Sequence, residues 1–114
     1  MLVATTLCGP SYTLAQSELE GPKVEIGAKI YQQRCVECHN DRGFGTVSLE
    51  RRYHGTVPAI LDQRRDLNGI FIRYAVRKGV SFMPFFRKTE ISDQEFDALS
   101  AYLSSDPTLR PRLK

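Results

Sequence analysis

The chain carries apolar residues at helical spacing in three separate stretches. The first runs from Val24 to Gln33, where Gly27 and Tyr31 lie at i and i+4 and therefore share one face of a helix. The glycine would let another helix approach closely, and the tyrosine would pack against that helix. We predict a helix over 24–33 that pairs with a second helix along this face.

Two further helices have clear start signals. Asp66 is a good N-cap for a helix over 67–78, which Gly79 would end at the C′ position. Ser92 and Glu95 form a capping-box sequence at the start of a final helix. Both helices carry an apolar stripe, formed by Phe71, Ile72, Ala75 and Val76 in the first and by Phe96, Leu99, Tyr102 and Leu103 in the last.

The remaining segments are less regular. We predict a long loop over residues 40–68, with one short helix near Val57–Gln63. Loops of this length in a compact domain usually serve a function or wrap around something. Residues 106–114 contain two prolines and three basic residues and are expected to form a loose tail. The residues that break up regular secondary structure in this segment are Gly43, Gly45, Gly55 and Pro58.

Length and composition are those of one small domain, which we place at 24–105. The 114 residues are 41% hydrophobic and 25% charged, with a formal net charge of +3. This charge is small, and no basic run or aromatic–basic interleaving is present, so nucleic-acid binding is not expected. A domain of this size buries a modest core, which a large apolar cofactor would extend.

The N-terminal residues are typical of a targeting segment. Residues 2–8 are apolar and uncharged, and Thr13 and Ala15 place small residues at −3 and −1 of a cleavage point. We predict that residues 1–15 are the remnant of a signal peptide, removed together with Cys8, and that residues 16–23 form a flexible leader. The alternative is a disordered apolar tail. The segment is too short to span a bilayer, so no stable membrane insertion is expected.

A C-x-x-C-H sequence at residues 35–39 directly follows the first predicted helix and is the signature of covalent haem attachment. In that chemistry Cys35 and Cys38 each add to one vinyl group of the porphyrin, and the imidazole of His39 lies under the iron. A structural zinc site would need a second pair of ligands, and no cysteine follows Cys38. A thioredoxin-like redox pair would need a βαβ context, which is not visible here.

The residue on the opposite face of the iron decides what such a haem does. One protein ligand leaves a site open to small molecules, whereas two ligands close it and favour electron transfer. Met83 is the predicted second ligand, because it lies in a loop between two predicted helices and thioether sulfur ligates haem iron. Pro84 would stiffen its backbone. His54, the only other histidine, is the rival ligand, although an exposed loop position is expected for it.

This order of features resembles class I c-type cytochromes over residues 24–104. The stretch 71–86 is similar to the cytochrome subunit of p-cresol methylhydroxylase-type flavocytochromes. The resemblance implies an all-α, class I cytochrome c-like fold of three to five helices wrapped around one covalently bound haem c. It also implies thioether bonds at Cys35 and Cys38 and axial ligation by His39 and Met83. In this family a proline carbonyl usually orients the axial histidine, and Pro58 is the candidate here.

We therefore expect a soluble single-haem carrier that takes electrons from a flavin- or quinone-dependent dehydrogenase and passes them to a downstream acceptor. No catalytic constellation is present, so the chain is not expected to be an enzyme by itself. A free electron carrier and a tightly held cytochrome subunit of a dehydrogenase complex both remain open. Because haem is attached outside the bacterial cytoplasm, a periplasmic location is expected. The alternative function is a five-coordinate haem sensor or a gas-binding protein. Docking could use the side chains that flank the predicted methionine ligand, which are Arg73, Arg77, Lys78, Phe82, Phe85, Phe86, Arg87 and Lys88.

Overall fold

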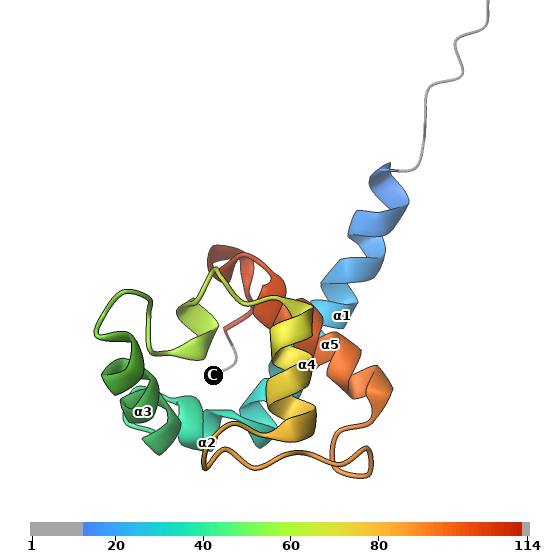
Figure 1. Ribbon diagram of the computed structural model, residues 1–114. Helices are drawn as coiled ribbons and strands as arrows, with labels where there is room; N and C mark the ends of the chain where they lie inside the picture. The colour runs from blue at the N-terminus through green and yellow to red at the C-terminus, as the bar shows by residue number, and fades with distance from the viewer. Residues whose placement is uncertain (1–12, 113–114) are drawn as a thin grey trace, which may run out of the picture.

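The computed structural model describes residues 13–112, which form five α-helices and two short 3-10 helices (Figure 1). Within these residues no β-strand is formed, and Val80 and Met83 make one isolated β-bridge. The expected all-α class is therefore confirmed. The elements are α1 (Thr13–Arg34), α2 (Val36–His39), α3 (Phe44–Tyr53), η1 (Leu61–Gln63), α4 (Gly69–Lys78), α5 (Asp93–Ser104) and η2 (Pro107–Leu109).

Helices α1 and α5 cross in close contact at the centre of the fold (Figure 1). Gly27 lies at the crossing, because a Cβ at this position would overlap the backbone carbonyl of Ala98. One turn later, the rings of Tyr31 and Tyr102 lie 5.5 Å apart between centroids. The predicted pairing through Gly27 and Tyr31 is therefore confirmed.

The core lies between this helix pair and α4. Phe96 and Leu99 of α5 are buried almost completely, and Ile72 and Val76 of α4 are buried as well. The capping box of α5 is formed as predicted: the hydroxyl of Ser92 accepts from the N–H of Glu95 at 3.2 Å, and the Glu95 carboxylate accepts from the N–H of Ser92 at 2.7 Å.

The start of α4 differs from the prediction. The helix begins at Gly69, and the side chain of Asn68 caps it by accepting from the N–H of Phe71 at 3.0 Å. The assignment of Asp66 as N-cap is wrong because its carboxylate instead binds the guanidinium of Arg64, with 2.9 Å between Nε and Oδ1. The predicted end is confirmed: Gly79 is the C-cap, with φ 76°.

The long loop predicted over 40–68 is wrong in its first half, which contains α3. Gly43 is the N-cap of α3 and therefore lies before the helix, where a glycine does not interrupt it. Only Thr46 of the helix is buried, so α3 lacks the apolar stripe that would have marked it in the sequence. In the second half of the segment, the short helix expected near Val57–Gln63 is present as the single 3-10 turn η1.

Helix α1 is longer than expected. It begins at Thr13 and includes residues 16–23, where a flexible leader was predicted. Pro22 lies inside the helix, in a part of α1 that extends away from the rest of the fold (Figure 1) and whose residues 20–23 are exposed. Residues 1–12, which hold most of the predicted signal segment and Cys8, lie outside the described range. None of the helices described is long and apolar enough to cross a membrane.

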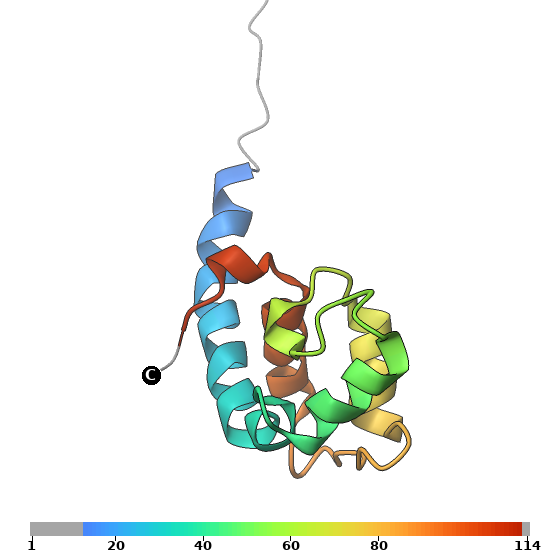
Figure 2. The same cartoon turned by 90° about the vertical axis from the view of Figure 1, so that its left-hand side faces the viewer.

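The expectation of a loose tail is wrong for residues 106–112. Asp106 caps the 3-10 turn η2 by accepting from the N–H of Thr108 at 2.9 Å. The segment then folds back beside α1 (Figure 2), and the side chain of Arg110 is only 7% exposed. Polar contacts that no periodic pattern reveals therefore order this part of the chain.

Candidate functional site

The C-x-x-C-H motif begins at Cys35, between α1 and α2, and its other four residues form α2 (Val36–His39). Helix α1 ends at Arg34, and the N–H groups of Cys38 and His39 bond to the carbonyl of Cys35 at 3.2 and 3.0 Å. This single helical turn leaves Cys35 half-buried and Cys38 exposed, while His39 is buried. The three groups of the motif are thus presented together from one rigid turn.

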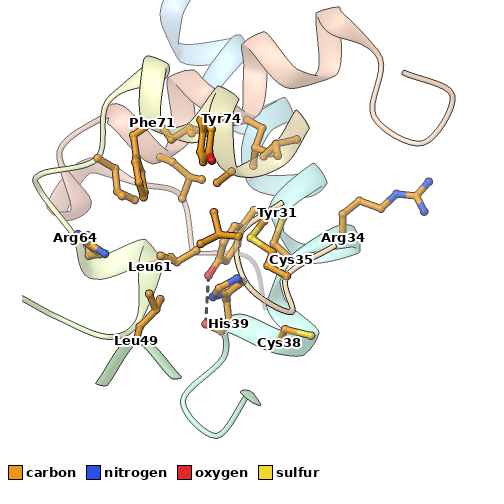
Figure 3. Close-up of a pocket in the computed structure, with 18 of the residues that line it drawn as sticks. Tyr31, Arg34, Cys35, Cys38, His39, Leu49, Leu61, Arg64, Phe71 and Tyr74 are labelled. Carbon is orange, nitrogen blue, oxygen red and sulfur yellow. Dashed lines mark hydrogen bonds between the residues drawn. The ribbon is translucent and has the colours of Figure 1, made fainter. Parts of the chain in front are cut away.

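A cavity of about 470 Å³ opens directly above this turn, and both thiols and His39 belong to its lining (Figure 3). Helices α3, α4 and α5, the turn η1 and the loop after α4 supply the remaining walls. Its lining is mostly apolar and includes Leu49, Leu61, Leu67, Ile72, Val76 and Leu103. A large apolar cavity beside two thiols and an imidazole fits the haem predicted from the motif.

The imidazole of His39 is buried beside the two thiols. Burial lowers its pKa, which favours the neutral ring, the form in which histidine ligates metals. Its backbone is held by Tyr31, whose hydroxyl donates to the carbonyl of His39 at 3.3 Å (Figure 3). Gly45 lies against the ring: a Cβ there would be 2.8 Å from Cε1 and 3.0 Å from Nδ1 of the imidazole.

Among residues 13–112, no group forms a hydrogen bond that would orient the imidazole of His39 through Nδ1. This atom is buried without a hydrogen-bond partner among the described residues, and Pro58 is exposed on the surface. The suggestion that the carbonyl of Pro58 orients His39 is therefore wrong. The ring is positioned by close packing against Gly45, whose role the sequence analysis missed because the glycine was interpreted only as an interruption of the chain.

The Cys35 thiol differs from the thiols of a redox-active pair. Burial, with a smaller contribution from Cys38, raises the pKa of the Cys35 thiol to about 12. Redox-active thiols instead have lowered pKa values and react as thiolates. A structural zinc site is built from a cluster of His, Cys, Asp or Glu side chains. In the described part of the chain, no three such side chains lie close enough together to hold a metal ion.

Met83 lines the same cavity as His39. Its backbone is held in a tight turn by two bonds to Val80, from Met83 N–H at 2.9 Å and to Met83 C=O at 3.2 Å. The following residues are fixed to α4, because the N–H of Phe86 bonds to the carbonyl of Val76 at 2.7 Å. His54, the rival ligand, is exposed at the C-terminal end of α3 and does not line the cavity.

Arg64 is a cavity residue that the sequence analysis missed. Its side chain is only 4% exposed, and its guanidinium binds Asp66 and lies 4.8 Å from the centroid of the Tyr53 ring. It lies across the cavity from Cys38 (Figure 3). In the sequence, Arg64 and Arg65 form a pair of adjacent charges that is typical of a protein surface. No local signal therefore predicted that Arg64 is buried.

Comparison with known families identifies the chain. The profile of the family described as cytochrome c oxidase, cbb3-type, subunit III, matches residues 22–103. No match was found among the curated proteins or among the solved structures. The match covers more than two thirds of the chain and includes the C-x-x-C-H turn and Met83. The chain therefore belongs to this family and is a c-type cytochrome, an electron-transfer protein with covalently bound haem c.

Proposed function

We propose that this cytochrome attaches its haem through Cys35 and Cys38 and ligates the iron with His39 and Met83. The observation that carries the proposal is that the three groups of the motif and Met83, 44 residues further along the chain, line one apolar cavity. When bound, the haem supplies a one-electron couple between ferrous and ferric iron. Two protein ligands would leave no open position on the iron, and thioether ligation raises the reduction potential.

The surrounding residues would restrict water and hold the cofactor in one orientation. The apolar side chains of the cavity limit access of solvent, and the hydrogen-bonded turn from Val80 to Met83 keeps the methionine in place. The propionates of haem lie on the edge opposite its vinyl groups. Because Arg64 lies across the cavity from Cys38, its guanidinium, whose Nε and Nη2 bind Asp66, would be the nearest candidate to hold a propionate through its remaining N–H groups.

Spectroscopy of two single variants tests the iron ligands. Ferric haem with a sulfur ligand has a weak far-red absorption band, which we expect in the wild type. Met83→Ala should abolish the band, whereas His54→Ala should retain it because His54 lies outside the cavity. If the band persists in Met83→Ala, the proposed ligand is wrong. Rapid and complete binding of carbon monoxide by the reduced wild type would instead support the alternative of an open, gas-binding haem.

The electron donor is, in our proposal, a flavin- or quinone-dependent dehydrogenase that the cytochrome meets in the periplasm. The similarity of residues 71–86 to cytochrome subunits of p-cresol methylhydroxylase-type enzymes supports this assignment. Purification of the native protein under mild conditions should recover a dehydrogenase with it, or a dehydrogenase should reduce it in a reconstituted assay. Recovery of an oxidase alone, with no dehydrogenase able to reduce the cytochrome, would contradict the proposed donor.

Docking would depend on aromatic contact more than on charge. Phe44, Phe82 and Phe85 are each more than half exposed, and the rings of Phe44 and Phe82 lie 5.3 Å apart between centroids. Most of the basic side chains nearby already have acidic partners, so they are poorly available to a redox partner. The ion pairs are Arg73–Asp97 at 3.6 Å, Arg77–Asp93 at 3.1 Å, Lys88–Asp93 at 2.6 Å and Arg87–Glu90 at 4.0 Å.

Rates of electron transfer distinguish these contacts. Phe82→Ala should slow electron transfer to the partner at all salt concentrations, because apolar contact is not screened by salt. Exchange of Arg87 and Lys88 for Glu should have a smaller effect. A large rate loss in the charge-exchanged variant that disappears at high salt would show instead that charge steers docking.

A further inference from the structure

Arg110 joins two parts of the chain that are distant in sequence. Its guanidinium donates to five backbone carbonyls. Three acceptors, Leu61, Asp62 and Arg64, belong to the segment around η1, and two, Leu103 and Ser105, lie at the end of α5. From Nη2, the distances are 3.0 Å to Arg64, 2.7 Å to Leu103 and 2.8 Å to Ser105, and Nη1 lies 3.4 Å from Leu61.

The segment that Arg110 holds is a wall of the haem cavity. The side chains of Leu61 and Arg64 line the cavity, as does Leu103 on the α5 side. The C-terminal segment reaches this wall a second time through Asp106, whose carboxylate lies 3.0 Å from Nη1 of Arg65. Because η1 is only a single 3-10 turn, its position depends on such contacts from outside the segment.

The bonds of Arg110 also bring a positive charge close to the motif. Within residues 13–112 this guanidinium forms no ion pair with a carboxylate, so the carbonyl oxygens compensate for its burial. It lies 5.5 Å from the centroid of the Tyr102 ring, and Tyr102 packs on Tyr31, which bonds to the backbone of His39. The arginine therefore packs beneath the same aromatic pair that supports the axial histidine.

We propose that Arg110 is a positioning residue that holds the wall at residues 61–64 closed over the haem. This inference rests on the haem site proposed above. A closed wall excludes solvent and external ligands from the iron, and burial of this kind is one of the factors that set haem reduction potentials. The C-terminal segment, of which none of the described residues 106–112 lines the cavity, would thereby control access to the cofactor.

The test compares three variants of the haem-loaded protein. Arg110→Met removes both the hydrogen-bond donors and the positive charge. Arg110→Lys keeps the charge but lacks the forked guanidinium that reaches five carbonyls. Arg112→Met is the control, because Arg112 is an exposed arginine of the same segment. Hydrogen exchange of residues 60–67 measures opening of the wall. The rate at which imidazole binds the ferric protein measures access to the iron.

In Arg110→Met we expect exchange of residues 60–67 to accelerate roughly tenfold or more, because hydrogen bonds from a charged donor shift local opening equilibria by about that factor. Exchange in α1 and α5 should change less. Imidazole should bind faster and the reduction potential should fall. Arg110→Lys should recover part of the potential, which responds to charge, but neither the exchange protection nor the slow binding of imidazole. Arg112→Met should match the wild type.

Two outcomes would overturn the inference. In the first, Arg110→Met matches Arg112→Met in exchange and imidazole binding. In the second, Arg110→Lys restores every property, which would reduce the role of Arg110 to its charge. If Arg110→Met does not retain haem, Arg110→Lys alone decides between these outcomes. Absence of the far-red band in the wild type would defeat the proposed methionine ligand, yet the exchange measurement would still report on the wall.

Discussion

The α1–α5 pair and the side of the cavity formed by α3 together with the wall at residues 61–64 are stabilised in different ways. In the pair, Phe96 of α5 and Ala28 and Ile30 of α1 are buried in the apolar core, and none of the three lines the haem cavity. Along the wall, Leu49 and Leu61 are only partly buried and face the cavity, and the most buried side chain there is the polar Arg64. The helix pair therefore has a core of its own, whereas residues 61–64 depend on the bonds of Arg110 and, in our proposal, on the haem.

This difference predicts which substitutions unfold the protein and which affect only the site. Changes in the part of the helix pair that does not border the cavity should lower the free energy of unfolding of the whole domain, because the side chains there are close-packed against the protein. Changes in the wall should act mainly on retention of haem and on access to the iron. The predictions below test this division, beginning with the largest expected effect.

The largest effect is expected at Ile30 of α1, which is buried in the core and, unlike Leu99, does not line the haem cavity. Ile30→Ala should lower the free energy of unfolding by about 2–5 kcal/mol, because it leaves a cavity in close-packed surroundings. Leu49→Ala is the matched variant in the wall, and it should cost clearly less, because Leu49 is only partly buried. Urea unfolding of the haem-loaded proteins measures both. Equal losses would show that the wall is as well packed as the helix pair.

Two glycines of α1 provide the next comparison. Gly27→Ala should destabilise the domain by about 1–3 kcal/mol, because the new methyl group would overlap the backbone of Ala98 and force α1 and α5 apart. Gly21→Ala is its control in the same helix: nothing lies within 4 Å of its Cβ, so it should stabilise the helix by about 0.5–1 kcal/mol. A Gly27→Ala variant as stable as the wild type would contradict the close crossing, and thermal unfolding distinguishes the two results.

Loss of the α5 cap should have a smaller effect. Ser92→Ala removes the hydroxyl that accepts from the N–H of Glu95 and should cost about 1 kcal/mol in urea unfolding. Thr89→Ala serves as control, because Thr89 is exposed in the loop before the helix and caps no element in the described structure. If both variants lose the same stability, the cap does not explain the loss.

The smallest effect is expected for Asp66 beside the wall. The bond from Arg64 lowers the pKa of this half-exposed carboxyl, so its contribution to stability is present above its ordinary pKa and is lost as the pH falls through the lowered value. Wild type and Asp66→Asn should therefore differ slightly in unfolding free energy near neutral pH and converge in acid. Urea unfolding across a pH series measures this, and a difference that stays constant down to the lowest pH would contradict the ion pair.

The sequence predicted those parts of the fold whose signals are local. The capping box at Ser92 and the Gly27–Tyr31 face depend on neighbours within one turn, and both are confirmed. The prediction failed at α3, because this helix buries only Thr46, and at Asp66, because Arg64 captured its carboxylate. The burial of Arg110 also had no local signal, since its five acceptors lie up to 49 residues away.

The sequence by itself determined the chemistry of the cofactor, because two thiols and an imidazole must be contiguous to attach a haem, and it made Met83 the candidate for the iron's second face. The tertiary structure alone decided that Met83 lies in the cavity and His54 outside it. It also decided that Arg64 and Arg110 are buried at the wall. These facts depend on which segments meet in space, and the backbone carbonyls that bind a guanidinium carry no mark in the sequence.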